Sequence, residues 1–216
     1  METRNQLAEN GFDIIKDLLT INDANEIKMH YLDLRSKGAK PGDKGGNPND
    51  ENDPLNKYPR FIDMHNWDER AKILVERFQP LVEDFCGCKV KLFRTMVYFK
   101  PPQARGVAFH QDERYSDTKN LTALWLALDK CDELNGCLYI VPKSHTKGLH
   151  NVKKIDISQT YFTSEEVDVS NTDLVPALLE EGDAVIFDGM TVHGSRKNNS
   201  DSFRASFIVH YERLSE

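Results

Sequence analysis

Cysteine, long apolar runs and surplus positive charge are all scarce in this sequence of 216 residues. Its four cysteines are too few to cross-link a domain of this length, which suits thiols kept in a reducing compartment. No apolar run approaches the roughly 20 residues that cross a bilayer, and residues 1–6 lack the apolar centre of a signal peptide. The net charge of −7 does not suit a surface that neutralises phosphates. We expect a cytoplasmic protein that binds neither nucleic acid nor membrane.

The cysteine spacing also argues against a structural zinc site. Cys86 and Cys88 are separated by one residue, whereas paired zinc ligands are usually separated by two to four. Cys131 and Cys137 do not form a second close pair. We interpret all four as structural or neutral.

Length and hydrophobic pattern indicate one domain over residues 1–216, with helices first and strands after them. Apolar residues at helical spacing follow a short strand at 11–15, and a second helix is expected after Asn66, its N-cap, with Pro80 kinking or restarting it. Short apolar segments at 89–99, 121–128, 137–141, 183–187 and 205–211 are typical of strands. This order predicts an α+β, mainly β fold with an antiparallel sandwich or barrel core.

Two segments stand outside this pattern. Residues 37–57 are dominated by Gly, Pro, Asn, Asp and Lys, which bury little apolar surface, so we expect a mobile loop. Residues 151–179 contain few strong β runs and form a possible lid together with that loop.

The sequence His110-Gln111-Asp112 is the strongest chemical feature of the chain. On a strand, residues two apart point to the same face, so one metal ion can bind both His110 and Asp112. His193 follows a predicted buried strand and supplies a third ligand. Two imidazoles and one carboxylate are the ligand set of non-haem Fe(II) oxygenases, which keep positions open for a cosubstrate and O₂.

Arg204 and Ser206 lie beyond His193 and share one face of the last predicted strand. A buried arginine is costly unless it meets an anion, and its planar fork suits a carboxylate. An organic acid is the expected partner.

Several motifs together resemble the phytanoyl-CoA dioxygenase family of Fe(II)/2-oxoglutarate-dependent oxygenases over roughly residues 95–210. They are the metal motif at 110–112, ALWLAL at 123–128, ELNGCL at 133–138, VPKSH at 141–145, and HGS at 193–195 leading through Asn198 and Ser200 to Arg204.

The resemblance implies a double-stranded β-helix (a cupin-like jelly roll) with N-terminal flanking helices. It also implies that His110, Asp112 and His193 hold Fe(II), and that Arg204 binds the distal carboxylate of 2-oxoglutarate, with O₂ as the second cosubstrate. Trp125 and Ser206 would be walls of the cosubstrate pocket. The implied reaction is hydroxylation with release of succinate and CO₂, although desaturation, epimerisation and cyclisation use the same ligands.

The substrate is less well defined by the sequence. Arg94, Met96 and Tyr98 share one face of a predicted strand, but the opposite set from Lys91 to Phe99 is equally available to the pocket. Gln111 and Tyr115, beside the metal motif, are further candidate contacts. Lys100 and Arg105 are expected to be solvated loop charges. We expect a small polar metabolite or natural-product intermediate.

Two other functions stay open. One is a cupin-like metal enzyme that works without 2-oxoglutarate, and the other is a non-catalytic domain that binds iron or an organic acid. Arg204 argues against the first, and the intact set of His110, Asp112, His193 and Arg204 argues against the second. The sequence allows a monomer or a homodimer.

Overall fold

The computed structural model describes residues 7–47, 49–156, 158 and 160–214. Its main feature is a pair of β-sheets. The larger, six-stranded sheet contains, in spatial order, β1 (Phe12–Ile15), β11 (Ala184–Asp188), β5 (Leu121–Ala127), β13 (Arg204–Arg213), β3 (Val90–Lys100) and β2 (Phe61–Ile62). The second sheet has five strands, in the order β10 (Val175–Pro176), β6 (Leu138–Ile140), β12 (His193–Ser195), β4 (Gly106–His110) and β8 (Thr160–Tyr161).

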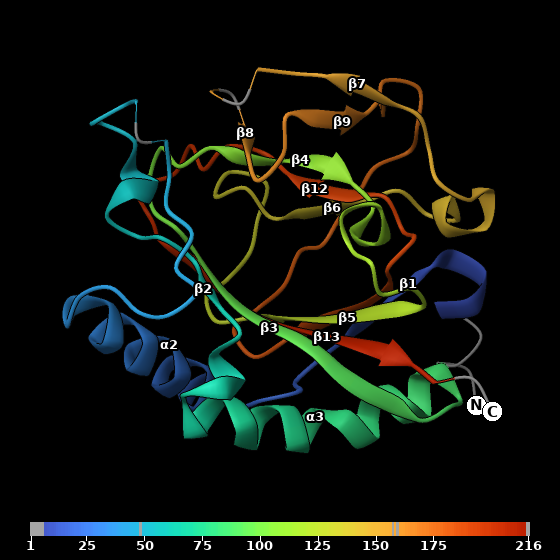
Figure 1. Cartoon of the computed structure of the whole chain (residues 1–216), viewed down its shortest axis with the longest axis horizontal. Helices are drawn as coiled ribbons and strands as arrows, with labels where there is room; N and C mark the ends of the chain where they lie inside the picture. The colour runs from blue at the N-terminus through green and yellow to red at the C-terminus, as the bar shows by residue number, and fades with distance from the viewer. Residues whose placement is uncertain (1–6, 48, 157, 159, 215–216) are drawn as a thin grey trace.

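Neighbouring strands in both sheets run antiparallel, except for the parallel pair β4 and β8. Helices α2 (Ile21–Ser36) and α3 (Glu69–Cys86) lie beneath the larger sheet, on the side away from the smaller one (Figure 1). The predicted order of helices followed by antiparallel strands is confirmed. Each of the five later predicted strand segments lies within one or two residues of an observed strand.

Alternation along β13 shows how the larger sheet divides the core. Phe207, Val209 and Tyr211 pack on the helical side with apolar residues of α2 and α3. Ile208 points the other way, into a second cluster that also contains Trp125 of β5 and Tyr139 of β6. Because side chains alternate along a strand, Arg204, Ser206 and His210 share the face of Ile208. Polar groups of β13 are thereby directed into the space between the two sheets.

The helices begin at side-chain caps, one of which differs from the prediction. Thr20 caps α2 by accepting a hydrogen bond from the Asp23 amide. The N-cap of α3 is Asp68, which accepts from the Ala71 amide, whereas Asn66, the predicted cap, belongs to the 3₁₀ helix η2 (Met64–Asn66). Of the two effects predicted for Pro80, a kink or a restart, the restart does not occur, because α3 runs through this residue. Burial of Phe78 and Val82 on either side of Pro80 favours helix continuation.

The two segments predicted to be loops contain short elements and contact each other. Residues 37–57 hold the 3₁₀ helix η1 (Pro54–Asn56), and Lys44 forms an isolated β-bridge with Arg60. Residues 151–179 contain β8, β10 and the small sheet of β7 (Val152–Lys154) with β9 (Glu165–Val167). Arg105 connects the segments, since its guanidinium binds both the Asp53 carboxylate and the Thr160 carbonyl. Their mobility stays a prediction.

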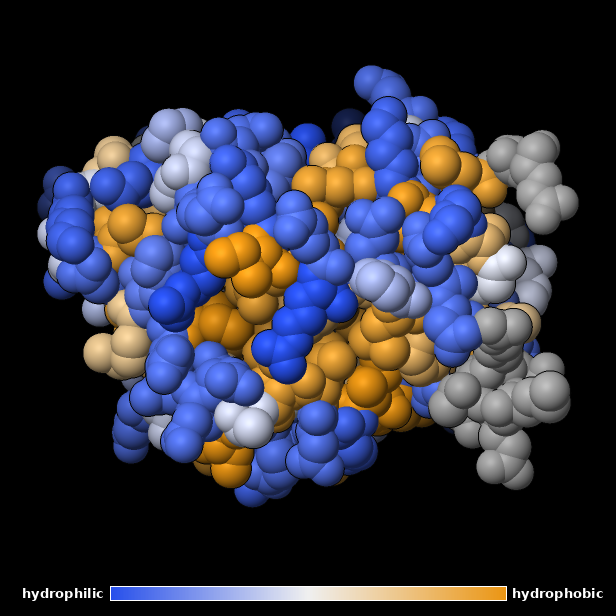
Figure 2. Space-filling model, turned by 90° about the horizontal axis from the view of Figure 1, so that it is seen from below, coloured by the Kyte–Doolittle hydropathy of each residue, from blue (hydrophilic) through white to orange (hydrophobic). Residues whose placement is uncertain are grey.

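The surface and the cysteines add two points. All four cysteines are free thiols, as expected. In the part of the chain that the structure describes, no helix combines the length and apolarity that a membrane span requires. The face formed by the helices carries apolar side chains among charged ones (Figure 2), and the exposed apolar residues of α2 and α3 include Ile21, Met29 and Ile73.

Candidate functional site

His110 and His193 are brought together by strand register. His110 is the last residue of β4 and His193 the first of β12, and the two are direct partners in the antiparallel pair. Their ring centroids are 4.3 Å apart, and both side chains are buried. Residues separated by more than 80 positions in the sequence thus present two imidazoles side by side between the sheets.

Asp112 joins the two histidines from outside the strand. It begins the 3₁₀ helix η3 (Asp112–Tyr115) instead of continuing β4, so the predicted same-face placement on one strand was wrong. The turn at the end of β4 nevertheless brings its carboxylate Oδ1 to 3.4 Å from His110 Nε2 and 3.7 Å from His193 Nε2. One ligand atom from each of the three residues lies within 4.8 Å of the others, the only such group of three or more His, Cys, Asp or Glu residues in the described ranges.

Backbone carbonyls fix the orientation of both imidazoles. His110 Nδ1 lies 2.8 Å from the Ala108 carbonyl oxygen, and His193 Nδ1 lies 3.0 Å from that of Thr191. A carbonyl only accepts, so Nδ1 carries the proton and Nε2 keeps its lone pair. Both Nε2 atoms face Asp112, as a metal site requires.

Burial and charge favour the protonation states of a metal site. Burial lowers the pKa of His193 to about 4, which keeps the imidazole neutral. Burial by itself would raise the pKa of Asp112. The neighbouring imidazoles of His193, His210 and His110, together with the hydrogen bond from His210, outweigh burial, so the pKa of Asp112 lies well below its usual range. Neutral imidazoles and an ionised carboxylate are the forms that bind metal ions.

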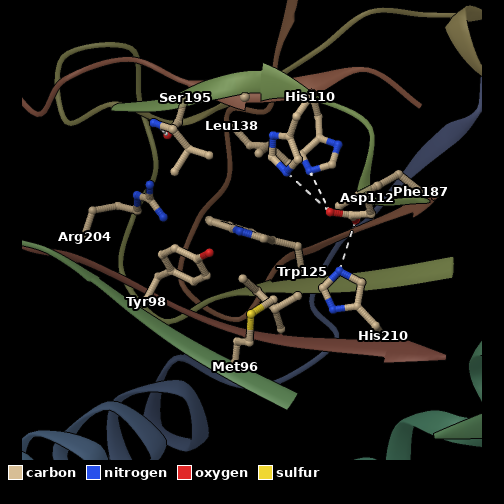
Figure 3. A pocket seen from close by; sticks show the side chains of 14 residues that line it. Met96, Tyr98, His110, Asp112, Trp125, Leu138, Phe187, Ser195, Arg204 and His210 are labelled. Carbon is tan, nitrogen blue, oxygen red and sulfur yellow. Dashed lines mark hydrogen bonds and ion pairs between the residues drawn. The ribbon is translucent and has the colours of Figure 1, made fainter. Parts of the chain in front are cut away.

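Arg204 approaches the same cavity from the side opposite the histidines (Figure 3). Its guanidinium donates to Ser206 Oγ at 3.3 Å and to the Gly136 carbonyl at 3.2 Å, and Nε has no hydrogen-bond partner. Among the described residues, no carboxylate lies within ion-pair distance of this guanidinium. A buried cation whose donors are only partly satisfied favours an anionic ligand in the cavity.

The other two predicted cosubstrate contacts, Trp125 and Ser206, differ in their access to the cavity. Trp125 lines the cavity, with the Arg204 guanidinium carbon 5.2 Å from its ring centroid. Ser206 is fully buried but is not part of the cavity wall, because its hydroxyl is turned to Arg204. Its position on the same face as Arg204 agrees with the sequence pattern, while its contact with the ligand space is indirect.

Among the candidate substrate contacts, Met96 and Tyr98 line the cavity beside the metal cluster. Arg94 and Tyr115 line an adjoining hollow. The expectation for Gln111 was wrong, because it lies outside both hollows: its amide nitrogen donates to the Gly148 and Met190 carbonyls, and its oxygen accepts from the His150 amide. Gln111 follows His110 on an extended backbone and therefore points to the opposite face.

Lys100 also differs from the prediction. It is buried at the end of β3, opposite Arg204 on β13, and is not a solvated loop charge. Its ammonium donates to Ser195 Oγ at 2.8 Å, to the Gly136 carbonyl at 3.1 Å and to the Arg196 carbonyl. Burial and the neighbouring Arg204 charge hold the pKa of Lys100 well below its usual value. Lys100 thereby fixes the Ser195 hydroxyl on the cavity wall.

One residue of the site was missed in the sequence. His210 lies on β13, and its Nε2 is 3.0 Å from Asp112 Oδ2, whereas the other oxygen, Oδ1, faces His110 and His193. In Figure 3, His210 and His110 lie on opposite sides of Asp112. Period-two spacing from Arg204 through Ser206 and Ile208 places His210 on the inner face, which is the pattern that could have identified it.

Comparison with known proteins yields one family and many proteins of the same fold. The family model for phytanoyl-CoA dioxygenase (PhyH) matches residues 7–206. The peroxisomal phytanoyl-CoA dioxygenase of Rattus norvegicus is 25% identical over 233 residues, covering 98% of this chain and 68% of its own length. Phytanoyl-CoA dioxygenase 1 of Oryza sativa is 34% identical over 122 residues, which is 55% of this chain and 43% of the rice protein.

Three solved structures with high TM-scores illustrate the fold. SnoK, described as a non-heme alpha ketoglutarate dependent carbocyclase from nogalamycin biosynthesis, has a TM-score of 0.79 at 20% identity, covering 97% of this chain and 82% of its own. EvdO2 of Micromonospora carbonacea complexed with 2-oxoglutarate has a TM-score of 0.73 at 18% identity over 100% and 93% of the chains. EctD of S. alaskensis has a TM-score of 0.78 at 16% identity, over 99% and 76%.

These likenesses confirm the predicted double-stranded β-helix, or jelly roll, because the matches extend over almost the whole chain. The family model likewise includes every residue of the His110, Asp112 and His193 cluster, the whole second sheet, and the larger sheet up to the third residue of β13. This protein therefore belongs to the phytanoyl-CoA dioxygenase (PhyH) family.

Proposed function

We propose that this chain, an Fe(II)- and 2-oxoglutarate-dependent dioxygenase by family, hydroxylates a small polar metabolite or natural-product intermediate. One observation carries the assignment of its site. The cluster of His110, Asp112 and His193 and the buried guanidinium of Arg204 face one cavity from opposite sides. A chelated 2-oxo acid needs both a metal and a partner for its distal carboxylate, and this arrangement offers the two together.

His110, Asp112 and His193 would hold the iron, and their donor set fits it. Two neutral imidazoles and one carboxylate leave coordination positions for further ligands. Iron bound together with 2-oxoglutarate and O₂ supplies an oxidant that can break a C–H bond, with succinate and CO₂ as coproducts. The protein contributes ligand orientation through the Ala108 and Thr191 carbonyls and through His210.

Arg204 would bind the distal carboxylate of 2-oxoglutarate. Its fork can pair with both oxygens of a carboxylate, and Lys100 holds Ser195 beside it as a second polar group. The indole of Trp125 and the apolar side chains of Leu138, Phe187 and Ile208 line the space between Arg204 and the metal cluster. These walls restrict water, which strengthens the charge interaction of Arg204.

A small substrate is favoured over a bulky thioester. The segments 37–57 and 151–179 approach each other beside the site, joined by Arg105 through Asp53 and Thr160. We propose that they act as lids over one oxygenase domain.

The four free thiols support a cytoplasmic setting, and the acidic net charge supports a small-molecule partner without nucleic acid. A monomer or homodimer is sufficient, because the proposed site is built from one chain.

An anaerobic titration with Fe(II) and then 2-oxoglutarate tests this function. We expect the visible metal-to-ligand charge-transfer band of a chelated 2-oxo acid in the wild type and its loss in His193→Ala. His30→Ala is the matched control, since His30 lies on α2 and pairs with Asp68 outside the cavity. Iron binding without the band would contradict the proposal and favour a cupin-like metal enzyme or a non-catalytic binding domain.

A further inference from the structure

A second hollow adjoins the cavity of Arg204. This outer chamber shares Tyr98, His110 and Asp112 with the cavity and is lined in addition by Arg60, Arg94, Tyr115 and Phe162. A molecule bound there would touch the metal cluster without occupying the space in front of Arg204. The outer chamber is therefore the place available for the substrate, as distinct from 2-oxoglutarate.

Arg60 is a cation without a counterion in this chamber. Its guanidinium carbon lies 5.2 Å from the ring centroids of Tyr98 and Tyr161 and 5.1 Å from that of Phe162. The guanidinium donates to the Tyr98 hydroxyl, while its Nε is buried with no hydrogen-bond partner. Over the described ranges, no carboxylate forms an ion pair with Arg60. The Arg60 guanidinium has five N–H donors and is surrounded by the rings of Tyr98, Tyr161 and Phe162. Among the described residues, its one side-chain acceptor is the Tyr98 hydroxyl.

Arg94, which also lines the outer chamber, has a counterion, unlike Arg60. Its Nε lies 3.4 Å from Asp63 Oδ1, so an ion pair already balances its charge. The chamber therefore presents one uncompensated guanidinium. A singly charged anion such as a carboxylate would balance it, whereas a phosphate monoester carries nearly two charges near neutral pH and would need a second free cation.

The backbone places Arg60 close to the metal cluster through both loop segments. Arg60 pairs with Lys44, whose carbonyl also accepts from the Tyr161 hydroxyl at 2.7 Å. The next residue, Phe162, has a φ of 99°, which is strained for a residue with a side chain. Its ring lies 5.0 Å from that of His110. A single aromatic ring therefore separates Arg60 from a proposed iron ligand.

The walls of the chamber also indicate the rest of the molecule. Phe162 and Tyr115 make an edge-to-face pair with centroids 5.3 Å apart, and Ile62, Phe93 and Met96 add apolar surface. Apolar and aromatic walls with one anion-binding group suit a molecule with an apolar body and a charged end.

We propose that the outer chamber binds the primary substrate, and that this substrate is a small organic acid whose carboxylate pairs with Arg60 while its apolar body lies against Phe162 and Tyr115. The inference rests on the proposed function, because it assigns the outer chamber to the molecule that is oxidised. It makes Arg60 a specificity-determining residue and distinguishes its role from that of Arg204.

Matched probes test the inference. Phenylacetate and its neutral isostere phenylacetamide are titrated calorimetrically into anaerobic protein loaded with Fe(II) and 2-oxoglutarate. We expect the wild type to bind the acid at least tenfold more tightly than the amide. Arg60→Gln should weaken the acid at least tenfold and change the amide less than twofold, and Arg60→Lys should keep part of the preference. Arg70→Gln, which removes an arginine that contacts the Glu26 carbonyl outside the chamber, is the charge-matched control.

The charge-transfer band of bound 2-oxoglutarate is recorded in the same samples, which separates this inference from the proposed function. A band without any preference for phenylacetate overturns the inference alone, whereas absence of the band in the wild type counts against the function. Loss of the band in Arg60→Gln would assign Arg60 to the cosubstrate and overturn the inference. Tighter binding of phenyl phosphate than of phenylacetate would also overturn it.

Discussion

His210 Nε2 lies 3.0 Å from Asp112 Oδ2, although the two residues belong to opposite sides of the jelly roll. Nε2 carries the proton in this contact, because the carboxylate is ionised and can only accept. Asp112 Oδ1 faces His110 and His193. One oxygen of Asp112 is thus held by the larger sheet, while the other faces the two histidines of the proposed metal site.

The first prediction concerns this contact. His210→Ala should lower Fe(II) affinity by about 10–100-fold, since it removes the group that orients a metal-binding carboxylate. Anaerobic Fe(II) titration measures the change. His210→Gln keeps an N–H donor and should recover part of the affinity, which a purely space-filling role would not produce. Unchanged Fe(II) binding in His210→Ala would show that Asp112 is oriented without it.

Arg204→Ala should raise the 2-oxoglutarate concentration needed for half-maximal charge-transfer absorbance by about 10–100-fold. The estimate follows from the loss of a charge-assisted contact worth roughly 1.5–3 kcal/mol. Fe(II) affinity measured without 2-oxoglutarate should stay within twofold, because Arg204 lies across the cavity from the ligands. Arg204→Lys keeps the charge but not the planar fork, so the 2-oxoglutarate concentration it needs should lie between those of the wild type and of Arg204→Ala. An unchanged requirement would place the distal carboxylate elsewhere.

The sequence predicted those parts of the site that depend on local alternation. Arg204 and Ser206 share a face of β13, and Met96 and Tyr98 share a face of β3, because side chains repeat every two residues along a strand. Patterns within a segment could not reveal contacts made by distant segments. The pairing of Asp112 with His210 depends on how η3 meets β13, which is a tertiary contact.

Lys100 shows the same limit in its burial. Lys100 lies between the predicted strand at 89–99 and the metal motif, where a charged residue is more often a solvated loop charge. Its acceptors come instead from the segments around Gly136 and Ser195, which reach it only through the sheet topology. A buried lysine cannot be recognised until its acceptors are known.

Lys100→Met should lower the free energy of unfolding by about 2–4 kcal/mol, because it removes a buried side chain that donates three hydrogen bonds. The affected groups are the Arg196 carbonyl and, in part, the Gly136 carbonyl, which keeps its bond from Arg204. Urea unfolding at pH 7 measures the loss. Lys91→Met on the exposed part of β3 is the control and should change stability by less than ~0.5 kcal/mol. Equal stability of the two variants would contradict this role for Lys100.

Asp183 gives a prediction with a defined pH dependence. Its buried carboxylate accepts from the Asp17 amide at 2.9 Å, the Glu180 amide at 2.8 Å and the Lys16 ammonium at 2.7 Å. Burial alone would raise the pKa of Asp183, but the Lys16 hydrogen bond and charge and the two backbone amides outweigh burial and lower it. Asp183→Asn should therefore cost roughly 2–4 kcal/mol at pH 7, because the amide nitrogen cannot accept these bonds.

The sign of the pH effect follows from the lowered pKa. The contribution of Asp183 is fully present above the unfolded-state pKa of about 3.9 and is lost as the pH falls through the lower pKa of the folded state. Urea unfolding should show a constant gap between wild type and Asp183→Asn from pH 8 to about pH 5, and a narrowing gap below about pH 4. Asp201→Asn is the control, because Asp201 is exposed, and its free energy of unfolding should equal that of the wild type over the same pH range. A gap that narrows already near pH 6 would mean that another group, and not Asp183, carries the effect.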